Sequence, residues 1–378
     1  MSKLLIISHT EHYKNANGKI VGWGPTVTEI NYLAALFDEV YHLAVFLNEV
    51  PPQSSIAYAS KNIHFVPIKP TGGKTLLKKF GVVWHAPKTL FKVIQLLHKV
   101  DVFQLRTPTG IGVYLIPFLT LFVNKEGWFK YAGNWNQQKA PYGYRLQRWL
   151  LKLQKRKVTI NGAWENQLPE FITFENPCLT EGDRVNGEQT LNSKKLTKPY
   201  NFCFVGGLNT NKGVQLIIDA FCELNHSNLG VLHIVGDGDL REKLELKAKK
   251  NEIPVVFHGF LNKSEIVEIY KNCHFILLPS KSEGFPKVIG EAMNFGCIPI
   301  VSNISCIGQY IQNNKNGFLL NSINKEALIF AVNQCFNISS ETFSTYILIN
   351  YKLAEKFTYF YYLARIQKEI LTESSITS

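Results

Sequence analysis

The chain has 378 residues, of which 46% are hydrophobic and 19% are charged, and it is rich in Phe and Tyr. This composition is typical of a folded globular protein and excludes disorder as the general state. The length is more than twice that of a typical domain of about 150 residues, so two domains are expected.

The net charge of +12 is distributed unevenly along the chain. Residues 1–180 contain 21 Lys and Arg against 10 Asp and Glu, whereas residues 181–378 contain 20 against 19. This asymmetry indicates an anionic partner for the first half, either nucleic acid or a membrane surface. The charge is not accompanied by a recognisable nucleic-acid-binding motif, so no nucleic acid is expected.

The sequence contains no segment that predicts membrane insertion or secretion. The longest uncharged apolar stretch, residues 111–123, is too short to span a bilayer, and the apolar run at the N-terminus is too short for a signal peptide. The seven cysteines are odd in number and form no C-x-x-C pair. We therefore expect a reducing, cytoplasmic setting and no metal site.

Short apolar runs alternate with helix-length segments, a pattern that predicts α/β domains with parallel sheets. In the first half, strands are expected at residues 4–8, 40–45, 63–68, 102–105 and 158–161. In the second half, they are expected at residues 201–205, 231–235, 255–257, 275–278 and 298–301.

Four segments follow from this pattern. Residues 1–178 are expected to form an N-terminal Rossmann-like domain and residues 200–350 a second one. Residues 179–199 are polar and are interpreted as a linker. Residues 351–378 predict an aromatic-rich C-terminal helix that packs back on the body of the protein, towards the N-terminal domain.

The most specific motif runs from Pro279 to Met293 and carries two carboxylates eight residues apart, Glu283 and Glu291. Glu283 falls in a loop after a predicted strand, and Glu291 falls about one turn into the next helix. Open α/β sheets bind ligands at this edge, and a helix N-terminus suits a phosphate. A solvated helix start with favourable acidic residues is the alternative.

These residues resemble the retaining GT-B glycosyltransferases, in particular family 4 (group 1). The shared features are the E-x7-E segment in an E-G-F-P loop, and the resemblance extends over about residues 200–320. It covers F-V-G-G-L-x3-K-G at 204–213, I-V-G-D-G at 234–238 and F-H-G-F at 257–260. The resemblance implies a GT-B architecture of two doubly wound domains facing a cleft, with the nucleotide-sugar donor on the C-terminal domain and the acceptor on the N-terminal domain.

The resemblance also implies roles for individual residues. Glu283 would bind the hydroxyls of the donor sugar, Lys212 would neutralise the diphosphate leaving group, and Glu291 would bind the ribose. The remaining donor-binding positions are Gly206, Gly207, Gly236, Asp237, His258, Gly259, Phe260, Gly284, Phe285, Pro286, Lys287 and Val288. Gly207 departs from the family, because many members carry an Arg there; Lys287 or Arg106 could substitute for it.

Candidate acceptor or phosphate residues lie in the first half. Gly18, Gly22 and Gly24 belong to a glycine-rich segment between the first strand and a helix. A dinucleotide-binding turn is the competing interpretation, but about nine residues separate that segment from the strand, which argues against it. Arg106 and the pair Asn134 and Trp135 follow predicted strands. A structural salt bridge for Arg106 and core packing for Trp135 are the alternatives.

Two basic stretches, Lys74–Lys99 and Arg145–Lys157, mix Lys and Arg with large apolar residues. In the second stretch, apolar residues at 146, 149, 150 and 153 share one side of the expected helix. Such helices suit a peripheral position on anionic lipid. An inward-packed helix with a solvated basic face is the alternative.

The expected function is transfer of a sugar from a nucleoside diphosphate sugar, UDP rather than GDP, to a hydroxyl acceptor with retention of configuration. No metal and no cofactor beyond the donor is implied. The acceptor is expected to be a glycan or a lipid-linked glycan in cell-surface polysaccharide synthesis. Two alternatives remain, a GT-B nucleotide-sugar 2-epimerase and a degenerate nucleotide-sugar-binding scaffold.

Overall fold

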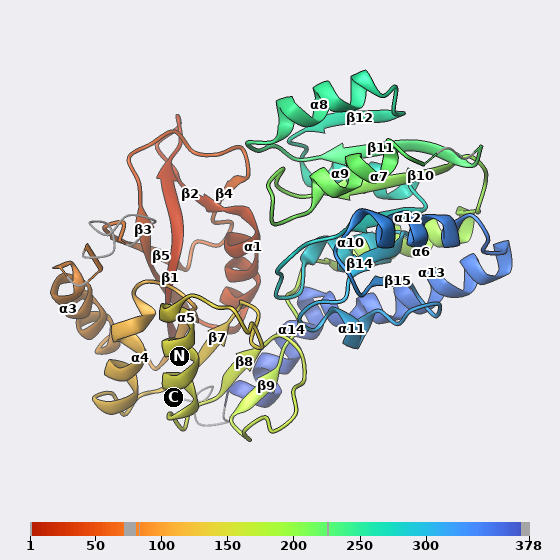
Figure 1. The fold of residues 1–378 in the computed structure, drawn as a ribbon. Helices are drawn as coiled ribbons and strands as arrows, with labels where there is room; N and C mark the ends of the chain where they lie inside the picture. The colour runs from red at the N-terminus through yellow and green to blue at the C-terminus, as the bar shows by residue number, and fades with distance from the viewer. Residues whose placement is uncertain (1, 72–80, 83, 225–226, 372–378) are drawn as a thin grey trace. The chain divides into compact units, whose positions relative to one another are not determined.

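The computed structural model describes residues 2–71, 81–82, 84–224 and 227–371, and the chain divides into two compact units (Figure 1). Unit 1 contains the residues up to Glu175 together with those from Tyr361 onward, and unit 2 runs from Asn176 to Phe360. Each unit is a parallel-stranded α/β structure, which confirms the expectation of two Rossmann-like units. Within the described ranges, no helix is long and apolar enough to cross a membrane.

The sheet of unit 1 has a parallel part in the order β5-β3-β1-β6-β7-β8-β9. Its strands are β1 (Lys3–Lys14), β3 (Glu39–Phe46), β5 (Ile63–Ile68), β6 (Val102–Thr107), β7 (Glu126–Tyr131), β8 (Val158–Ile160) and β9 (Phe171–Thr173). Two short antiparallel strands, β2 (Ile20–Trp23) and β4 (Ser55–Ala57), extend the sheet beside the end of β1.

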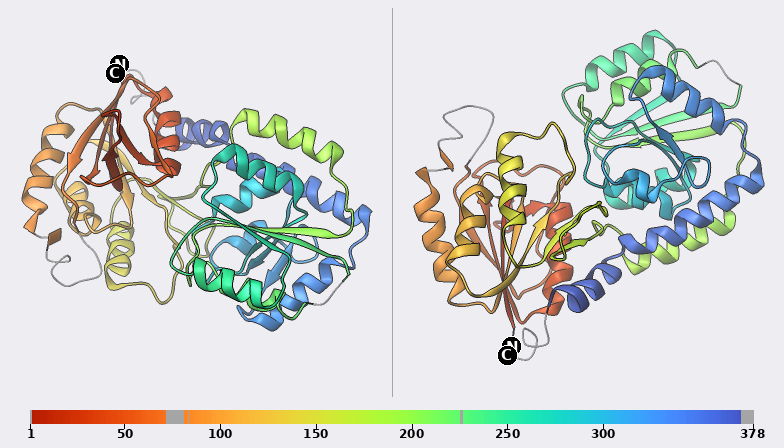
Figure 2. Two further views of the ribbon diagram at one scale, coloured as in Figure 1. Left: turned by 90° about the horizontal axis from the view of Figure 1, so that it is seen from above. Right: turned by 60° about the horizontal axis from the view of Figure 1, so that its bottom comes forward.

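Helices cover both faces of this sheet. Helices α3 (Ala86–Leu97), α4 (Gly112–Leu121) and α5 (Tyr142–Lys152) contribute to one buried cluster. Helix α1 (Gly24–Leu33), which leads into the turn η1 (Ala34–Leu36), contributes to another. Figure 2 shows the strands of unit 1 between α1 on one side and α3 on the other. The segment around Lys74–Lys79 lies outside the described residues.

The end of the chain belongs to unit 1. Helix α14 (Tyr359–Arg365) and the π-helical turn η3 (Ile366–Ile370) bring Tyr362 and Ile366 into the cluster beneath α1. Tyr362 lies edge-on against Phe174, with ring centroids 5.9 Å apart. Tyr362, one of the C-terminal aromatic residues in the segment predicted to pack on the body of the protein, therefore belongs to the core of unit 1.

The sheet of unit 2 has six parallel strands in the order β12-β11-β10-β13-β14-β15. They are β10 (Tyr200–Val205), β11 (Leu229–Val235), β12 (Val255–Gly259), β13 (Phe275–Leu278), β14 (Ile298–Ser302) and β15 (Phe318–Leu320). The helices are α6 (Glu181–Ser193), α7 (Val214–Phe221), α8 (Arg241–Lys250), α9 (Lys263–Asn272), α10 (Lys287–Asn294), α11 (Ile307–Tyr310), α12 (Lys325–Cys335) and α13 (Ser340–Ala354), followed by the turn η2 (Glu355–Phe357).

Residues 181–193 form helix α6 instead of the expected linker. The Thr180 hydroxyl accepts a hydrogen bond from the Asp183 amide, and the Asp183 carboxylate accepts one from the Thr180 amide. This capping box starts a helix that composition alone did not indicate. Helix α6 lies beside α13 (Figure 2), where Arg184 donates to the Tyr351 carbonyl.

Candidate functional site

The strand order of unit 2 reverses between β10 and β13, so the loops after these strands diverge to opposite sides. Ligands of open α/β sheets bind at this switch point, at the carboxyl ends of the strands. Residues 206–213 follow β10 and residues 279–286 follow β13. The predicted residues Lys212 and Glu283 belong to these two loops.

Lys212 and Glu283 form an ion pair across the switch point. The Lys212 Nζ lies 2.6 Å from the Glu283 Oε1, although 71 residues separate them in the chain. Both side chains retain some exposure, 27% for Lys212 and 11% for Glu283. A cation and a carboxylate are therefore held together at a position that a ligand can reach.

Backbone contacts join the two loops that carry the pair. The Lys281 amide donates to the Asn211 carbonyl at 2.8 Å, and the Asn211 side-chain amide donates to the Ser282 carbonyl at 3.0 Å. Gly213 has a φ of +73°, and a Cβ there would lie 2.2 Å from the Pro279 carbonyl oxygen. Only glycine allows this approach. Asn211 is a positioning residue that the sequence did not single out, although it directly precedes Lys212.

Glu291 lies on α10, on the helix that begins after the E-G-F-P loop. The Tyr270 hydroxyl donates to its Oε2 at 3.4 Å. Burial raises the pKa of Glu291, whereas Lys263, Lys287 and the Tyr270 hydroxyl act in the opposite direction. Tyr270 approaches from α9, a contact that no local sequence pattern signals.

The loop between Glu283 and α10 is anchored by its aromatic residue. The Phe285 ring is buried and stacks on Phe357 at 4.5 Å between centroids, and it also meets Tyr310 edge-on. Pro286 precedes the first turn of α10, and its side chain makes no capping hydrogen bond. Gly284 lies within this loop, Lys287 begins the helix, and Val288 packs against the neighbouring core. The amides proposed to cradle phosphate are thus attached to a rigid helix start.

A buried hydroxyl lies two residues after β13. Ser280 is fully buried, and its Oγ has no hydrogen-bond partner among the described residues. An unpaired buried hydroxyl costs free energy unless a water or ligand satisfies it.

The glycine loops after β10 and β11 are tied to one another. A Cβ on Gly236 would lie 2.0 Å from the Gly206 carbonyl oxygen, and the Gly236 amide donates to the Gly259 carbonyl at 2.7 Å. The Asp237 carbonyl accepts from the Leu208 amide, and its side chain accepts from the Gly238 amide. Asp237 therefore serves the turn itself.

Gly207 is the position where an arginine was expected. A Cβ there would lie 3.1 Å from the Asn209 Nδ2, which is the end of a side chain. A Cβ at this position is therefore accommodated if the Asn209 side chain moves slightly.

The candidate base-contacting residues lie at the end of β12, which contains His258 and Gly259, and directly after it at Phe260. His258 Nε2 and His233 Nδ1 lie 2.9 Å apart, and the two rings stack. Burial lowers the pKa of both histidines, and each ring partly satisfies the other. Phe260 is exposed just beyond Gly259. Its ring is available to an incoming flat group.

The structure corrects the reading of residues 18–24 as a glycine-rich ligand loop. Gly18, with a φ of +74°, lies in the tight turn that joins β1 and β2. Gly22 lies within β2, where a Cβ would collide with the buried His12 ring. Gly24 begins α1 and lies against the Ser54 carbonyl. These glycines make a hairpin and its close packing possible.

His12 belongs to a buried polar chain in unit 1. Its Nε2 lies 2.8 Å from the Tyr58 hydroxyl, which in turn lies 2.6 Å from the His42 Nδ1. The Ser8 hydroxyl contacts the other nitrogen of His42 at 2.7 Å. Burial lowers the pKa of His12 to about 4, so this ring is neutral in the fold at neutral pH.

Arg106 is also corrected, because it lies inside unit 1. Its guanidinium donates to the Glu29 Oε1 at 3.0 Å and to the Gln104 side chain at 2.8 Å. Lys130 Nζ lies 2.5 Å from the same Glu29 oxygen, and Tyr362 donates to it at 3.1 Å. The guanidinium is thus bound in a buried cluster and cannot replace the arginine expected at Gly207.

Trp135 and Asn134 serve local structure. The Trp135 ring packs edge-on against Tyr131 at 5.0 Å and against Phe171 at 4.9 Å between centroids. The Asn134 Oδ1 accepts from the Asn136 amide and closes a turn. These contacts fit the core-packing alternative for Trp135, whose side chain is partly buried.

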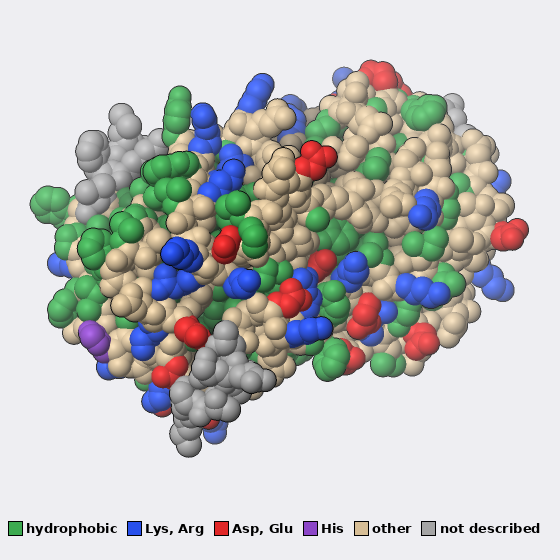
Figure 3. Space-filling view, turned by 90° about the horizontal axis from the view of Figure 1, so that it is seen from below, with side chains coloured by type: hydrophobic (Ala, Val, Ile, Leu, Met, Phe, Trp, Pro, Cys, Tyr) green, Lys and Arg blue, Asp and Glu red, His purple; other side chains and the backbone are tan. Residues whose placement is uncertain are grey.

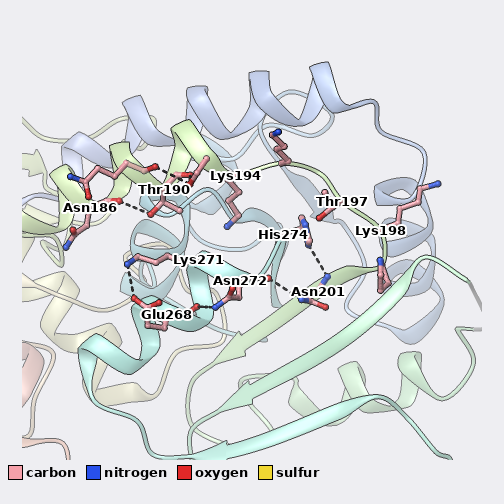
Figure 4. Close-up of a pocket in the computed structure, with 14 residues that line it drawn as sticks. Asn186, Thr190, Lys194, Thr197, Lys198, Asn201, Glu268, Lys271, Asn272 and His274 are labelled. Atoms are coloured by element: carbon pink, nitrogen blue, oxygen red, sulfur yellow. Dashed lines mark hydrogen bonds and ion pairs between the residues drawn. The ribbon is translucent and has the colours of Figure 1, made fainter.

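A cavity of about 740 Å³ lies elsewhere in unit 2 (Figure 4). Its lining includes Asn201 at the start of β10 and His274 just before β13, at the opposite edge of the sheet from Lys212 and Glu283. The Asn201 amide donates to the His274 Nδ1 at 3.0 Å, and Lys271 pairs with Glu268. This cavity is separate from the switch point.

All seven cysteines are free thiols. Among the described residues, no group of three or more His, Cys, Asp or Glu side chains is placed to hold a metal ion.

Residues 188–344 match the family model described as glycosyl transferases group 1. The matched segment lies within unit 2. An uncharacterized glycosyltransferase of Methanocaldococcus jannaschii is 29% identical over 182 residues, covering 47% of this chain and 49% of that protein. Glycogen synthase of Mycobacterium tuberculosis is 26% identical over 183 residues, covering 46% and 44%. The chain spans about half the length of these curated relatives.

A solved structure resembles the chain over nearly its whole length. HepE of Anabaena, crystallised in complex with UDP, covers 97% of this chain and 99% of its own, with a TM-score of 0.70 and 15% identity. The chain therefore has the GT-B fold, as the sequence predicted.

Proposed function

We propose that this protein transfers a glycosyl unit from a UDP-sugar to a hydroxyl acceptor with retention of anomeric configuration. The observation that carries the proposal is the Lys212–Glu283 ion pair at the switch point between β10 and β13. The match of residues 188–344 to the group 1 glycosyl transferases supports the reaction type. The UDP bound by HepE, a protein of the same fold, supports the choice of nucleotide.

The two residues have complementary roles in this proposal. Glu283 accepts hydrogen bonds from hydroxyls of the donor sugar, and Lys212 faces the diphosphate. The bond between the anomeric carbon and the diphosphate oxygen breaks while the acceptor oxygen bonds to that carbon from the same face. The departing diphosphate takes the proton of the acceptor hydroxyl. Placement and charge stabilisation therefore supply the catalysis.

The remaining residues complete the donor site. Glu291 binds the ribose hydroxyls, and the amides at the start of α10 receive phosphate or sugar oxygens with the helix dipole behind them. Phe260 and the end of β12 meet the base. The proposal involves no metal ion and no cofactor apart from the donor.

We further propose that the acceptor is a lipid-linked glycan and that the protein contributes to cell-surface polysaccharide synthesis at the cytoplasmic face of a membrane. The charge excess of residues 1–180 supports this choice.

The test is donor binding and turnover by variants of the ion pair. Lys212→Ala is expected to lower turnover of a UDP-sugar by roughly a hundredfold or more, because a charge-stabilising group is lost from the transition state. Glu283→Gln should likewise abolish most turnover. Glu268→Gln is the matched control, since it breaks an ion pair of 2.8 Å with Lys271 on α9 and should leave turnover unchanged. Full turnover by the Lys212 variant would contradict the assignment.

The variant Gly207→Arg distinguishes an active glycosyltransferase from a degenerate scaffold that only binds the nucleotide sugar. In an active enzyme, we expect the variant to bind UDP more tightly with turnover retained. A parent that binds UDP but gains turnover only with Gly207→Arg would support the scaffold.

A further inference from the structure

Helices α3, α4 and α5 cover one and the same face of the sheet in unit 1. Their inward residues Val93, Leu115 and Leu151 all belong to one buried cluster, which does not contain residues of α1. The outward surfaces of these three helices therefore form one side of the unit, called here the α3–α5 face.

Helix α5 presents an apolar stripe to solvent. Leu146, Trp149 and Leu153 recur at spacings of three and four residues, which places them on one side of the helix. Trp149 is 56% exposed and Leu153 is 61% exposed, whereas Gln147 and Leu151 are buried. Three of the four residues of the apolar side predicted from the sequence, Leu146, Trp149 and Leu153, thus point to solvent, whereas Leu150 packs against the core.

The neighbouring helices add further apolar side chains to this face. Phe91 and Ile94 are exposed on α3, and Leu121 and Phe122 are exposed at the end of α4. Figure 3 shows hydrophobic side chains gathered with Lys and Arg on one side of the molecule. Exposed apolar groups gathered in this way mark an interaction surface.

The charge of the same region has one sign. Residues 51–164 contain 18 Lys and Arg, and their only acidic residues are Asp101 and Glu126. Lys88 on α3 and Arg145 and Lys152 on α5 are exposed beside the apolar side chains. A partner of this face must therefore accept apolar side chains and carry negative charge.

We propose that the α3–α5 face docks onto the surface of an anionic lipid membrane. A bilayer interface offers both an apolar phase for Trp149 and Leu153 and anionic headgroups for the lysines. Nucleic acid would leave the bulky aliphatic side chains in water. This inference goes beyond the proposed transfer reaction and does not depend on it, because vesicle binding requires neither donor nor acceptor.

The test is cosedimentation of the full chain with vesicles of phosphatidylcholine alone and of phosphatidylcholine mixed equally with phosphatidylglycerol. We expect binding to the anionic vesicles only, weakened by added salt. The double variant Trp149→Ser, Leu153→Ser should weaken binding at least roughly tenfold, because two anchoring side chains are lost. The double variant Lys152→Glu, Lys155→Glu should do the same through charge.

Matched controls lie on unit 2. Leu246→Ser with Phe330→Ser removes apolar side chains that are 64% and 63% exposed, and Lys249→Glu with Lys250→Glu reverses exposed charges on α8. Neither control should alter vesicle binding. The proposal is overturned if the wild type ignores anionic vesicles, if the controls lose binding equally, or if the Trp149 and Leu153 variant binds as well as the wild type. Binding of single-stranded RNA in preference to the vesicles would also overturn it.

Discussion

The two carboxylates of the E-x7-E segment have different surroundings, and the difference defines their chemistry. Glu283 lies beside the Lys212 ammonium and retains some exposure, so its carboxylate can accept hydrogen bonds from the hydroxyl groups of a ligand. Glu291 is desolvated within unit 2, and burial raises the pKa of its carboxyl above the ordinary value. A ribose diol would supply hydrogen-bond donors to this carboxylate, which is otherwise costly to ionise.

Replacing Glu291 with Gln is expected to raise the thermal stability of the protein while removing its ability to bind UDP. In the folded protein the pKa of Glu291 is raised, so folding favours its protonated carboxyl. This carboxyl therefore stabilises the fold below its ordinary pKa, and the stabilisation is lost as pH rises through its pKa in the folded state. The variant should therefore have a higher Tm than the wild type at pH 7, and this difference should shrink as pH falls towards about 4. The increase of Tm with UDP should disappear.

The measurement is thermal unfolding across pH with and without UDP. Glu268→Gln, which removes an exposed carboxylate from the same unit, should show neither effect. A Glu291→Gln protein that keeps its UDP response would remove this residue from the ribose site.

At the scale of elements, caps and turns decide what composition leaves undefined. Residues 181–193 are polar, and among them only Gly187 and Thr190 are buried. The capping box of Thr180 and Asp183 supplies the hydrogen bonds that the first turn lacks, and Asp183 also pairs with Lys263 at 2.5 Å. The segment is therefore a helix of unit 2 and a neighbour of α9.

Thr180→Ala is expected to lower the free energy of unfolding by about 1 kcal/mol, because the Asp183 amide loses its side-chain acceptor. Urea unfolding followed by circular dichroism measures this change. Thr197→Ala, at an exposed position outside the helices, should change stability by much less. Equal effects of the two substitutions would show that the cap contributes nothing.

At the scale of the whole molecule, the chain leaves unit 1 after Glu175 and returns to it at Tyr361. Tyr362, Ile366 and Leu371 then complete the core beneath α1. The Tyr362 hydroxyl also donates to Glu29, which holds Arg106 and Lys130 in the same buried cluster. The integrity of the first unit therefore depends on the last residues described.

Tyr362→Ala should destabilise unit 1 by about 3–5 kcal/mol, since a buried aromatic ring and a hydrogen bond to a buried carboxylate are lost. Calorimetry should show one transition shifted to lower temperature, while the transition that UDP raises keeps its response. Phe360→Ala removes an exposed ring two residues earlier and should leave both transitions in place. Loss of the UDP response in Tyr362→Ala would contradict this division of the chain.

Local patterns in the sequence were sufficient for most of the parallel strands of both sheets and for the E-x7-E segment. An apolar run such as 275–278 followed by glycine and proline predicts a buried strand and a loop without any distant contact. The short strands β2, β4, β9 and β15 were not predicted, although β8 and β13, which are as short, were. The hairpin of Gly18 and Gly22 was misread as a ligand loop.

The sequence by itself thus determined the α/β alternation, the two-unit organisation and the order of the donor-side motifs, since these depend on residues close together in the chain. Only the tertiary structure decided which of these residues meet. The ion pair of Lys212 with Glu283 joins residues 71 positions apart. The buried Arg106 guanidinium donates a hydrogen bond to Glu29, and the Trp135 ring packs against Phe171. The outward direction of Leu146, Trp149 and Leu153 was decided in the same way, because Gln147 makes its hydrogen bonds to Thr109 on the inner side of α5. Such pairings depend on the sheet order, which no local pattern encodes.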